Sequence, residues 1–114
     1  MTDIDQKIEK LLEVSRESVK CRHVFLDKKI ESNESYRKQM NSYCDEILKH
    51  CDADIIDYLK TKPDSVKLHF GLGLWIRNNY IYKGLMHTLA PNADEESDEI
   101  IYYLIKYVCG EIKE

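Results

Sequence analysis

Glycine and proline are scarce in this sequence and unevenly placed. The chain of 114 residues contains four glycines and two prolines, and none of them precedes Thr61. These two residue types oppose the α-helix more strongly than any others. Their absence from residues 1–60 therefore predicts long helices in the first half of the chain. All but Gly110 lie between Pro63 and Pro91, which predicts that helices are interrupted there.

Long apolar runs are also lacking. No stretch approaches the ~18 consecutive apolar residues that a membrane-spanning helix requires, so we expect no membrane partner. The first ten residues carry Asp3, Asp5 and Glu9 and lack the apolar segment of a secretory signal. We therefore expect a cytoplasmic protein.

An excess of positive charge is missing as well. The chain has 17 Lys and Arg against 21 Asp and Glu, a net charge of -4. The basic residues are spread out and form no continuous run. Because binding to duplexes draws much of its affinity from neutralised phosphates, nucleic acid is disfavoured as a partner.

The cysteines form no CxxC pair. They lie at Cys21, Cys44, Cys51 and Cys109. Cys44 and Cys51 are seven residues apart and would share one face of a continuous helix, where His50 and His23 would be the further ligands of a zinc ion. Cysteine is also among the most commonly buried residues. We favour reduced, buried thiols and expect neither a metal nor a cofactor.

What the sequence does contain is helical periodicity. Hydrophobic residues make up 43% and charged residues 33% of the chain, a mixture typical of a globular domain. Apolar residues three and four apart predict a helix from near Asp3 to the polar stretch at 31–35, and a second one from Tyr36. The pattern leaves open whether 44–60 is one helix or two. A final helix is expected from around Asp94 to near Gly110.

The segment 66–77 is almost entirely apolar in its middle, which predicts a buried central helix. Gly71 and Gly73 would each cost about 1 kcal/mol there relative to alanine, and close approach of a neighbouring helix would offset that cost. A buried strand is the alternative. The sequence therefore predicts a single all-α domain over 1–114, a four- to five-helix, mainly antiparallel bundle.

One segment resembles a known signature. Residues 69–80 read HFGLGLWIRNNY and resemble the pattern HFG-x-G-x-W-I-R-N-N-W of an uncharacterised bacterial family, a domain of unknown function. The acidic stretch from Asp94 to Ile101 resembles a second element of that family. Together they cover about half the chain, although Tyr80-Ile81-Tyr82 departs from the family's Trp-Gly-Leu-Trp. The resemblance implies a small helical bacterial protein and carries no assigned activity.

Arg77-Asn78-Asn79 is the first candidate site. A guanidinium clamps a carboxylate or phosphate through two parallel hydrogen bonds, and His69 would lie two turns away on roughly the same face. The alternative is architectural: Arg77 pairs with Asp94, Glu95 or Asp98, while Asn78 caps the helix. His69 has the right pKa range for a general base, but no residue at an informative spacing completes a triad.

The eight tyrosines supply the second candidate. Tyrosine is enriched at protein-binding surfaces, and the partner-binding candidates are Tyr80, Tyr102 and Tyr103, together with Asn79. Tyr102 and Tyr103 are adjacent on a helix, so they face different directions and one of them should be partly exposed. The alternative is that these rings form the half-buried rim of a small core.

These observations favour a non-enzymatic module that binds another protein, such as a toxin-neutralising immunity protein or a phage-encoded inhibitor. No catalytic constellation, cofactor loop or metal spacing points elsewhere. The alternative is a small-ligand-binding or enzymatic domain with its site around His69, Arg77 and Asn78. A third reading is a homodimer formed through the apolar stripe of the N-terminal helix.

Overall fold

The computed structural model describes residues 3–112, except for the side chains of residues 5, 8–19, 65 and 66. Backbone contacts divide the chain into two compact units, Met1–Ser32 and Asn33–Glu114. The first unit is the helix α1 (Asp3–Ser32), which confirms the predicted first helix. None of the described helices is long and apolar enough to cross a membrane.

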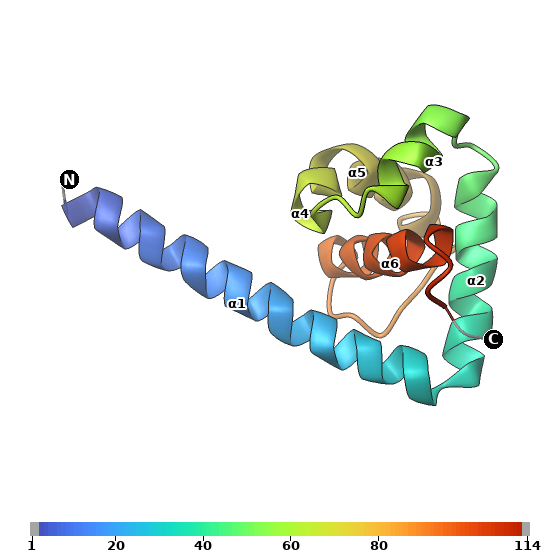
Figure 1. Ribbon diagram of the computed structural model, residues 1–114, viewed down its shortest axis with the longest axis horizontal. Helices are drawn as coiled ribbons and strands as arrows, with labels where there is room; N and C mark the ends of the chain where they lie inside the picture. Colours follow the sequence, from blue (N-terminus) through green and yellow to red (C-terminus); the bar gives the residue numbers. More distant parts are fainter. Residues whose placement is uncertain (1–2, 113–114) are drawn as a thin grey trace. The chain divides into compact units, whose positions relative to one another are not determined.

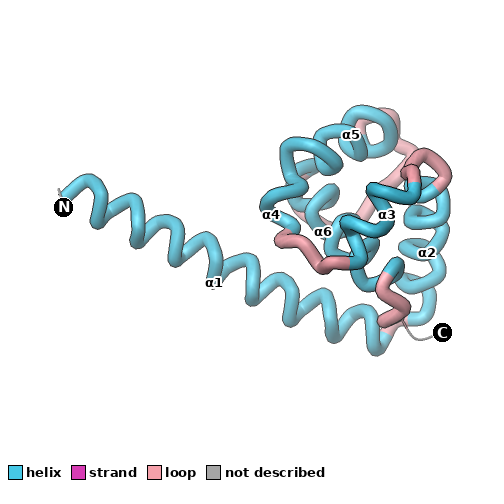
Figure 2. The backbone as a smooth tube through the Cα atoms, turned by 45° about the horizontal axis from the view of Figure 1, so that its top comes forward, coloured by secondary structure: helices cyan, strands magenta, loops and turns pink. Residues whose placement is uncertain are grey.

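The second unit is built from helices and loops alone in the part that is described. Its elements are α2 (Glu34–Leu48), α3 (Ala53–Lys60), α4 (Ser65–Leu68), η1 (His69–Gly73), α5 (Leu74–Ile76), η2 (Arg77–Ile81) and α6 (Ala93–Val108). The four short elements follow one another without a break, so Ser65–Ile81 forms one helical segment with two π-helical turns, here called the 65–81 helix. Figure 2 shows these helices in cyan and the loops that join them in pink. The all-α bundle is confirmed.

Polar side chains start three of these helices. Asn33, Asp52 and Asn92 each accept a hydrogen bond from a backbone N–H in the first turn of α2, α3 and α6, respectively. Such caps satisfy donors that have no partner inside the helix. The cap at Asp52 resolves the open question about 44–60: this stretch contains the end of one helix and the whole of another.

The core of the second unit surrounds α6. This helix packs against α2, α3, α4 and both π-helical turns, and Figure 1 shows it between α2 and the segment that carries α4 and α5. Its side chains Ile100, Ile101, Tyr103 and Leu104 are fully buried. Met40, Cys44 and Ile47 from α2, Leu59 from α3 and Ile76 complete the core.

Burial of the predicted central helix is narrower than its composition indicates. Residues 66–77 are helical, so the strand alternative is wrong, but only one face is buried. Gly73, Ile76 and Arg77 are buried, whereas Phe70 is 81% and Leu74 is 47% exposed. An apolar run shows that apolar side chains surround the helix. It does not show which of them other parts of the chain bury.

The two glycines of this helix differ. A Cβ at Gly73 would lie 3.1 Å from Nη1 of Arg77 and 3.5 Å from Cδ1 of Ile101, whereas a Cβ at Gly71 would meet nothing within 4 Å. The predicted close approach is therefore confirmed at Gly73 and wrong at Gly71. The guanidinium of Arg77 and the side chain of Ile101 from α6 lie where a larger side chain at position 73 would be.

The 65–81 helix extends further than predicted. It runs through Arg77, Asn78 and Asn79 to Ile81, so Asn78 does not cap it in a left-handed conformation. After Ile81 the described residues form turns, bends and irregular backbone as far as Asn92. The hydroxyl of Tyr43 holds this loop by accepting from the N–H of His87 at 3.1 Å and donating to its carbonyl at 3.2 Å.

Candidate functional site

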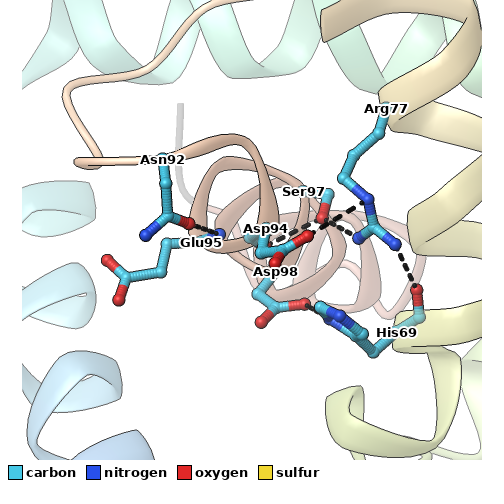
Figure 3. Close-up of polar contacts among 7 residues, drawn as sticks. All are labelled: His69, Arg77, Asn92, Asp94, Glu95, Ser97 and Asp98. Atoms are coloured by element: carbon cyan, nitrogen blue, oxygen red, sulfur yellow. Dashed lines mark hydrogen bonds and ion pairs between the residues drawn. The ribbon is translucent and has the colours of Figure 1, made fainter.

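Arg77 is buried in the second unit, and each of the three nitrogens of its guanidinium has a partner there. Its side chain is 5% exposed, and its Nε lies 3.4 Å from Oδ1 of Asp94. Nη1 donates to Oγ of Ser97 at 2.7 Å, and Nη2 donates to the carbonyl of His69 at 3.3 Å. Figure 3 shows the guanidinium between the start of α6 and the His69 turn. Hydrogen bonds made by a charged group are stronger than neutral ones, so this cluster joins two elements firmly.

His69 meets the same end of α6. Its Nδ1 lies 2.8 Å from Oδ1 of Asp98, and the side chains are 22% and 30% exposed, respectively. Because an ionised carboxylate only accepts hydrogen bonds, Nδ1 carries the proton in this pair. The ring of His69 also packs edge-on against Phe70 with centroids 5.0 Å apart. None of these contacts, within the described part of the chain, supplies a nucleophile for His69 to activate.

The electrostatics of the α6 start explain why these residues gather. Asp94, Glu95 and Glu96 lie in the first turn, where the helix dipole favours negative charge. Arg77 and His69 then approach an end of the helix that already carries several carboxylates. Ser97 completes the arrangement, since its Oγ accepts from Arg77 and donates to the carbonyl of Asp94 at 2.9 Å. The alternative that paired Arg77 with Asp94 is confirmed.

The other residues of the first candidate site separate. Asn78 is exposed, and Asn79 donates from Nδ2 to the carbonyl of Trp75 at 2.8 Å within its own helix. Tyr80 is buried, contacts Trp75 edge-on, and its hydroxyl lies 3.4 Å from Oε1 of Glu46. Burial, followed by the charge of Glu46, raises the pKa of Tyr80. These side chains therefore do not converge on one ligand position.

The tyrosines of α6 divide as their adjacency predicts. Tyr102 is half-buried and Tyr103 is fully buried. The hydroxyl of Tyr103 donates to Oδ1 of Asn41 at 2.5 Å, and its ring packs edge-on against Tyr36. Burial raises the pKa of Tyr103 above its usual range. The prediction that Tyr103 binds a partner is wrong, because a side chain without exposed surface cannot contact another protein.

An apolar groove lies between α3 and the 65–81 helix. Its volume is about 540 Å³, and its lining includes Ile55, Tyr58, Leu72 and Trp75, with Gly71 on one wall. Ile55 is 42% and Tyr58 is 48% exposed. The periodicity of the apolar residues alone does not identify this surface. Its signal is that α3 places four large apolar residues in only eight positions, more than one face of so short a helix can bury.

A second, polar cleft lies between α2 and the loop after the 65–81 helix. Its lining includes Lys38, Asn41, Glu46, Lys49 and Tyr80, and its volume is about 630 Å³. The carboxylate of Glu46 pairs with Lys49 at 3.3 Å, and this interaction lowers the pKa of Glu46. Glu46 and Lys49 thus neutralise each other along α2, and Lys38 pairs with Glu34 of the same helix at 3.5 Å.

The cysteines do not gather. Cys44 is fully buried and Cys51 lies beyond the end of α2, where its thiol donates to the carbonyl of Ile47 at 3.4 Å. Burial raises the pKa of both thiols. The side chains that the structure describes include no group of three or more His, Cys, Asp or Glu residues placed to hold a metal ion.

Comparison with known proteins adds no relative. No family model, curated protein or solved structure matches this chain. The resemblance of His69–Tyr80 to the family of unknown function therefore stays a prediction, and the functional argument depends on the chemistry of the described residues.

Proposed function

We propose that this chain is a non-enzymatic module that binds another protein chain through the apolar groove between α3 and the 65–81 helix. An immunity-type or inhibitor role falls within this proposal, because such proteins act by binding one partner and need no catalytic centre. The observation that carries the proposal is the exposure of Ile55 and Tyr58 on the lining of this groove.

The polar residues support this choice. Arg77 binds Asp94, Ser97 and the His69 carbonyl, and His69 binds Asp98. Polar groups that bind a ligand face the open space of a pocket. The donors of Arg77 are directed into the fold, so the residues best suited to anion chemistry serve architecture.

The composition of the groove favours a protein over a small molecule. Pockets for small molecules have volumes of roughly 300–1,000 Å³ and add a few convergent polar groups that fix the ligand's orientation. Here the carboxylate of Asp52 accepts from the N–H of Ile55 at 2.9 Å as a helix cap. Nε2 of His50 lies 3.6 Å from Oε1 of Glu46, and the imidazole packs against the ring of Trp75. The exposed side chains Ile55 and Tyr58 give the groove an apolar surface with an aromatic ring. Such a surface is typical of the core of a protein interface.

The test is capture of proteins from a lysate of the native host on three immobilised chains. Wild type and Tyr58→Glu are compared with Tyr82→Glu, a matched control at an exposed tyrosine outside the groove. We expect the wild type and the control to retain the same partner and Tyr58→Glu to lose it. Equal retention by all three chains would contradict a role for the groove.

The alternative, a small-anion site at Arg77 and Asn78, has its own test. A ligand that binds only the folded state raises the melting temperature. We expect phosphate and citrate to change neither the melting temperature of the wild type nor that of Asn78→Ala. A rise that is present in the wild type and lost in Asn78→Ala would favour the ligand-binding alternative.

A further inference from the structure

The ionisable groups of the groove are mostly acidic. Asp52 and Asp54 lie on its lining beside Ile55 and Tyr58, and His50 is the remaining ionisable side chain apart from Cys51 and the phenol. Asp57 is exposed on the same short helix. A segment that fills this groove should therefore combine an apolar ridge with positive charge at its sides.

Helix α1 presents such a face. Lys20, Val24 and Lys28 are spaced four residues apart, and Cys21 and Phe25 lie beside them with the same spacing. All five are exposed, with Val24 at 56% and Phe25 at 66%. Residues four apart are neighbours on one side of a helix. The result is a short apolar ridge with a lysine at each end, here called the Lys20–Lys28 face.

We propose that the groove binds the Lys20–Lys28 face of α1 from a second copy of this chain. The inference rests on the proposed function, because it names the chain that the groove binds. Phe25 and Val24 would cover Ile55 and Tyr58, while the two lysines lie near Asp52 and Asp54.

The dimensions of the two surfaces agree. The Lys20–Lys28 face covers nine residues and so extends about 13.5 Å along its helix, at about 1.5 Å per residue. The eight residues of α3 span about 12 Å by the same rise. Both surfaces are partly apolar, and an isolated helix gains most of its stability from packing its apolar face. When each copy donates α1 to the other, the two contacts are equivalent and the assembly closes as a dimer.

Paired variants test this exchange. Phe25→Glu disables α1 and leaves the groove intact, whereas Ile55→Glu disables the groove and leaves α1 intact. We expect the wild type to have twice the 13.5 kDa mass of one chain by light scattering, and each variant alone to be monomeric at the same concentration. An equimolar mixture should regain a dimer, because the α1 helix of Ile55→Glu still fits the groove of Phe25→Glu.

Three results would overturn the inference. A wild-type chain that stays monomeric at every concentration leaves the groove to a different protein, so the proposed function survives and this inference fails. If Ile55→Glu still forms a dimer, the two chains associate through a surface other than the groove, and the inference fails. A mixture that remains monomeric while both variants keep wild-type circular dichroism shows that α1 and the groove are not complementary.

A second readout needs no substitution that could disturb folding. Cys21 lies on the Lys20–Lys28 face and Cys51 lines the groove. A short bismaleimide should therefore join Cys21 of one wild-type chain to Cys51 of the other, and mass spectrometry of the covalent dimer identifies the joined peptides. A covalent dimer joined solely through two Cys21 residues would instead indicate that α1 pairs with α1.

Discussion

Gly73 and Gly71 are two residues apart and have opposite surroundings, which makes them a matched pair at the residue scale. An alanine normally stabilises a helix interior by about 1 kcal/mol relative to glycine. We expect that gain for Gly71→Ala, because its Cβ meets open space. Gly73→Ala should lose most or all of it, since its Cβ would lie 3.1 Å from the Arg77 guanidinium. Urea unfolding measures both; equal stabilisation by the two alanines would show that Arg77 is not held in place.

Arg77 itself should contribute stability. Replacing it with methionine keeps the length and removes the bonds to Ser97 and Asp94. Hydrogen bonds from a charged donor contribute roughly 1.5–3 kcal/mol, so Arg77→Met should lower the free energy of unfolding by about that amount. Asp94→Asn should cost much less, because the carboxylate side chain is 65% exposed and exposed pairs contribute about 1 kcal/mol at most. A wild-type stability in Arg77→Met would contradict the architectural role.

Buried phenols predict how stability changes in alkali. Burial is the main cause that raises the pKa of Tyr36, Tyr80 and Tyr103 in the folded chain. Their stabilising contribution is complete below the unfolded value of about 10 and is lost as the pH rises above it. Above that pH the unfolded chain has released protons that the folded chain retains, so the free energy of unfolding falls.

Tyr36→Phe tests this dependence, because it removes one of the phenols. The slope of stability against pH above 10 should flatten by up to about 1.4 kcal/mol per pH unit, and Tyr82→Phe, at an exposed ring, should leave it unchanged. Urea unfolding between pH 8 and 11 gives these slopes. Parallel slopes in wild type and Tyr36→Phe would be inconsistent with a buried, protonated Tyr36.

At the scale of elements, the start of α6 is the point on which the second unit depends. Asn92 accepts from the N–H of Glu95 at 2.9 Å, and the next turns carry the partners of Arg77 and His69. Losing an asparagine cap costs about 1 kcal/mol, so Asn92→Ala should destabilise the fold by that amount. Asn78→Ala is the control: Asn78 is exposed inside a helix, where alanine is the better helix former. The prediction fails if thermal melts place both variants on the same side of the wild type.

The sequence predicts element boundaries well where a polar residue ends or starts a helix. The stretch around Ser32 and Asn33 separates α1 from α2 as expected, and Gly110 follows α6 with a φ of 73°. It fails where the helix continues through polar residues. Arg77, Asn78 and Asn79 have the composition of a helix end, yet the contact of Arg77 with α6 and the π-helical turn keep them in the helix.

The candidate site, like the element boundaries, was predictable from the sequence only in part. The pairing of Arg77 with an acidic residue of α6 was predictable from charge alone, because a buried guanidinium needs a carboxylate and the last helix opens with several. The four large apolar residues of α3 indicate surplus apolar surface, but they do not place the groove, because exposure of Ile55 and Tyr58 depends on how α3 packs against the 65–81 helix. Periodicity identifies an apolar face without identifying what covers it.

For the whole molecule, the described residues divide into an interior in which charges are paired and a surface groove in which apolar side chains are exposed. The central claim is that a second copy of this chain covers this groove. Cys51 reports on it directly, because it lines the groove, and Cys109 serves as an internal reference, because it is half-buried and lies outside the groove lining.

The most direct measurement is the rate at which iodoacetamide alkylates each cysteine of the wild type as the protein concentration is raised at constant pH. The account predicts that the rate at Cys51 falls as chains associate while the rate at Cys109 stays constant, and that Tyr58→Glu abolishes the fall. A Cys51 rate that is independent of protein concentration in the wild type would contradict the account.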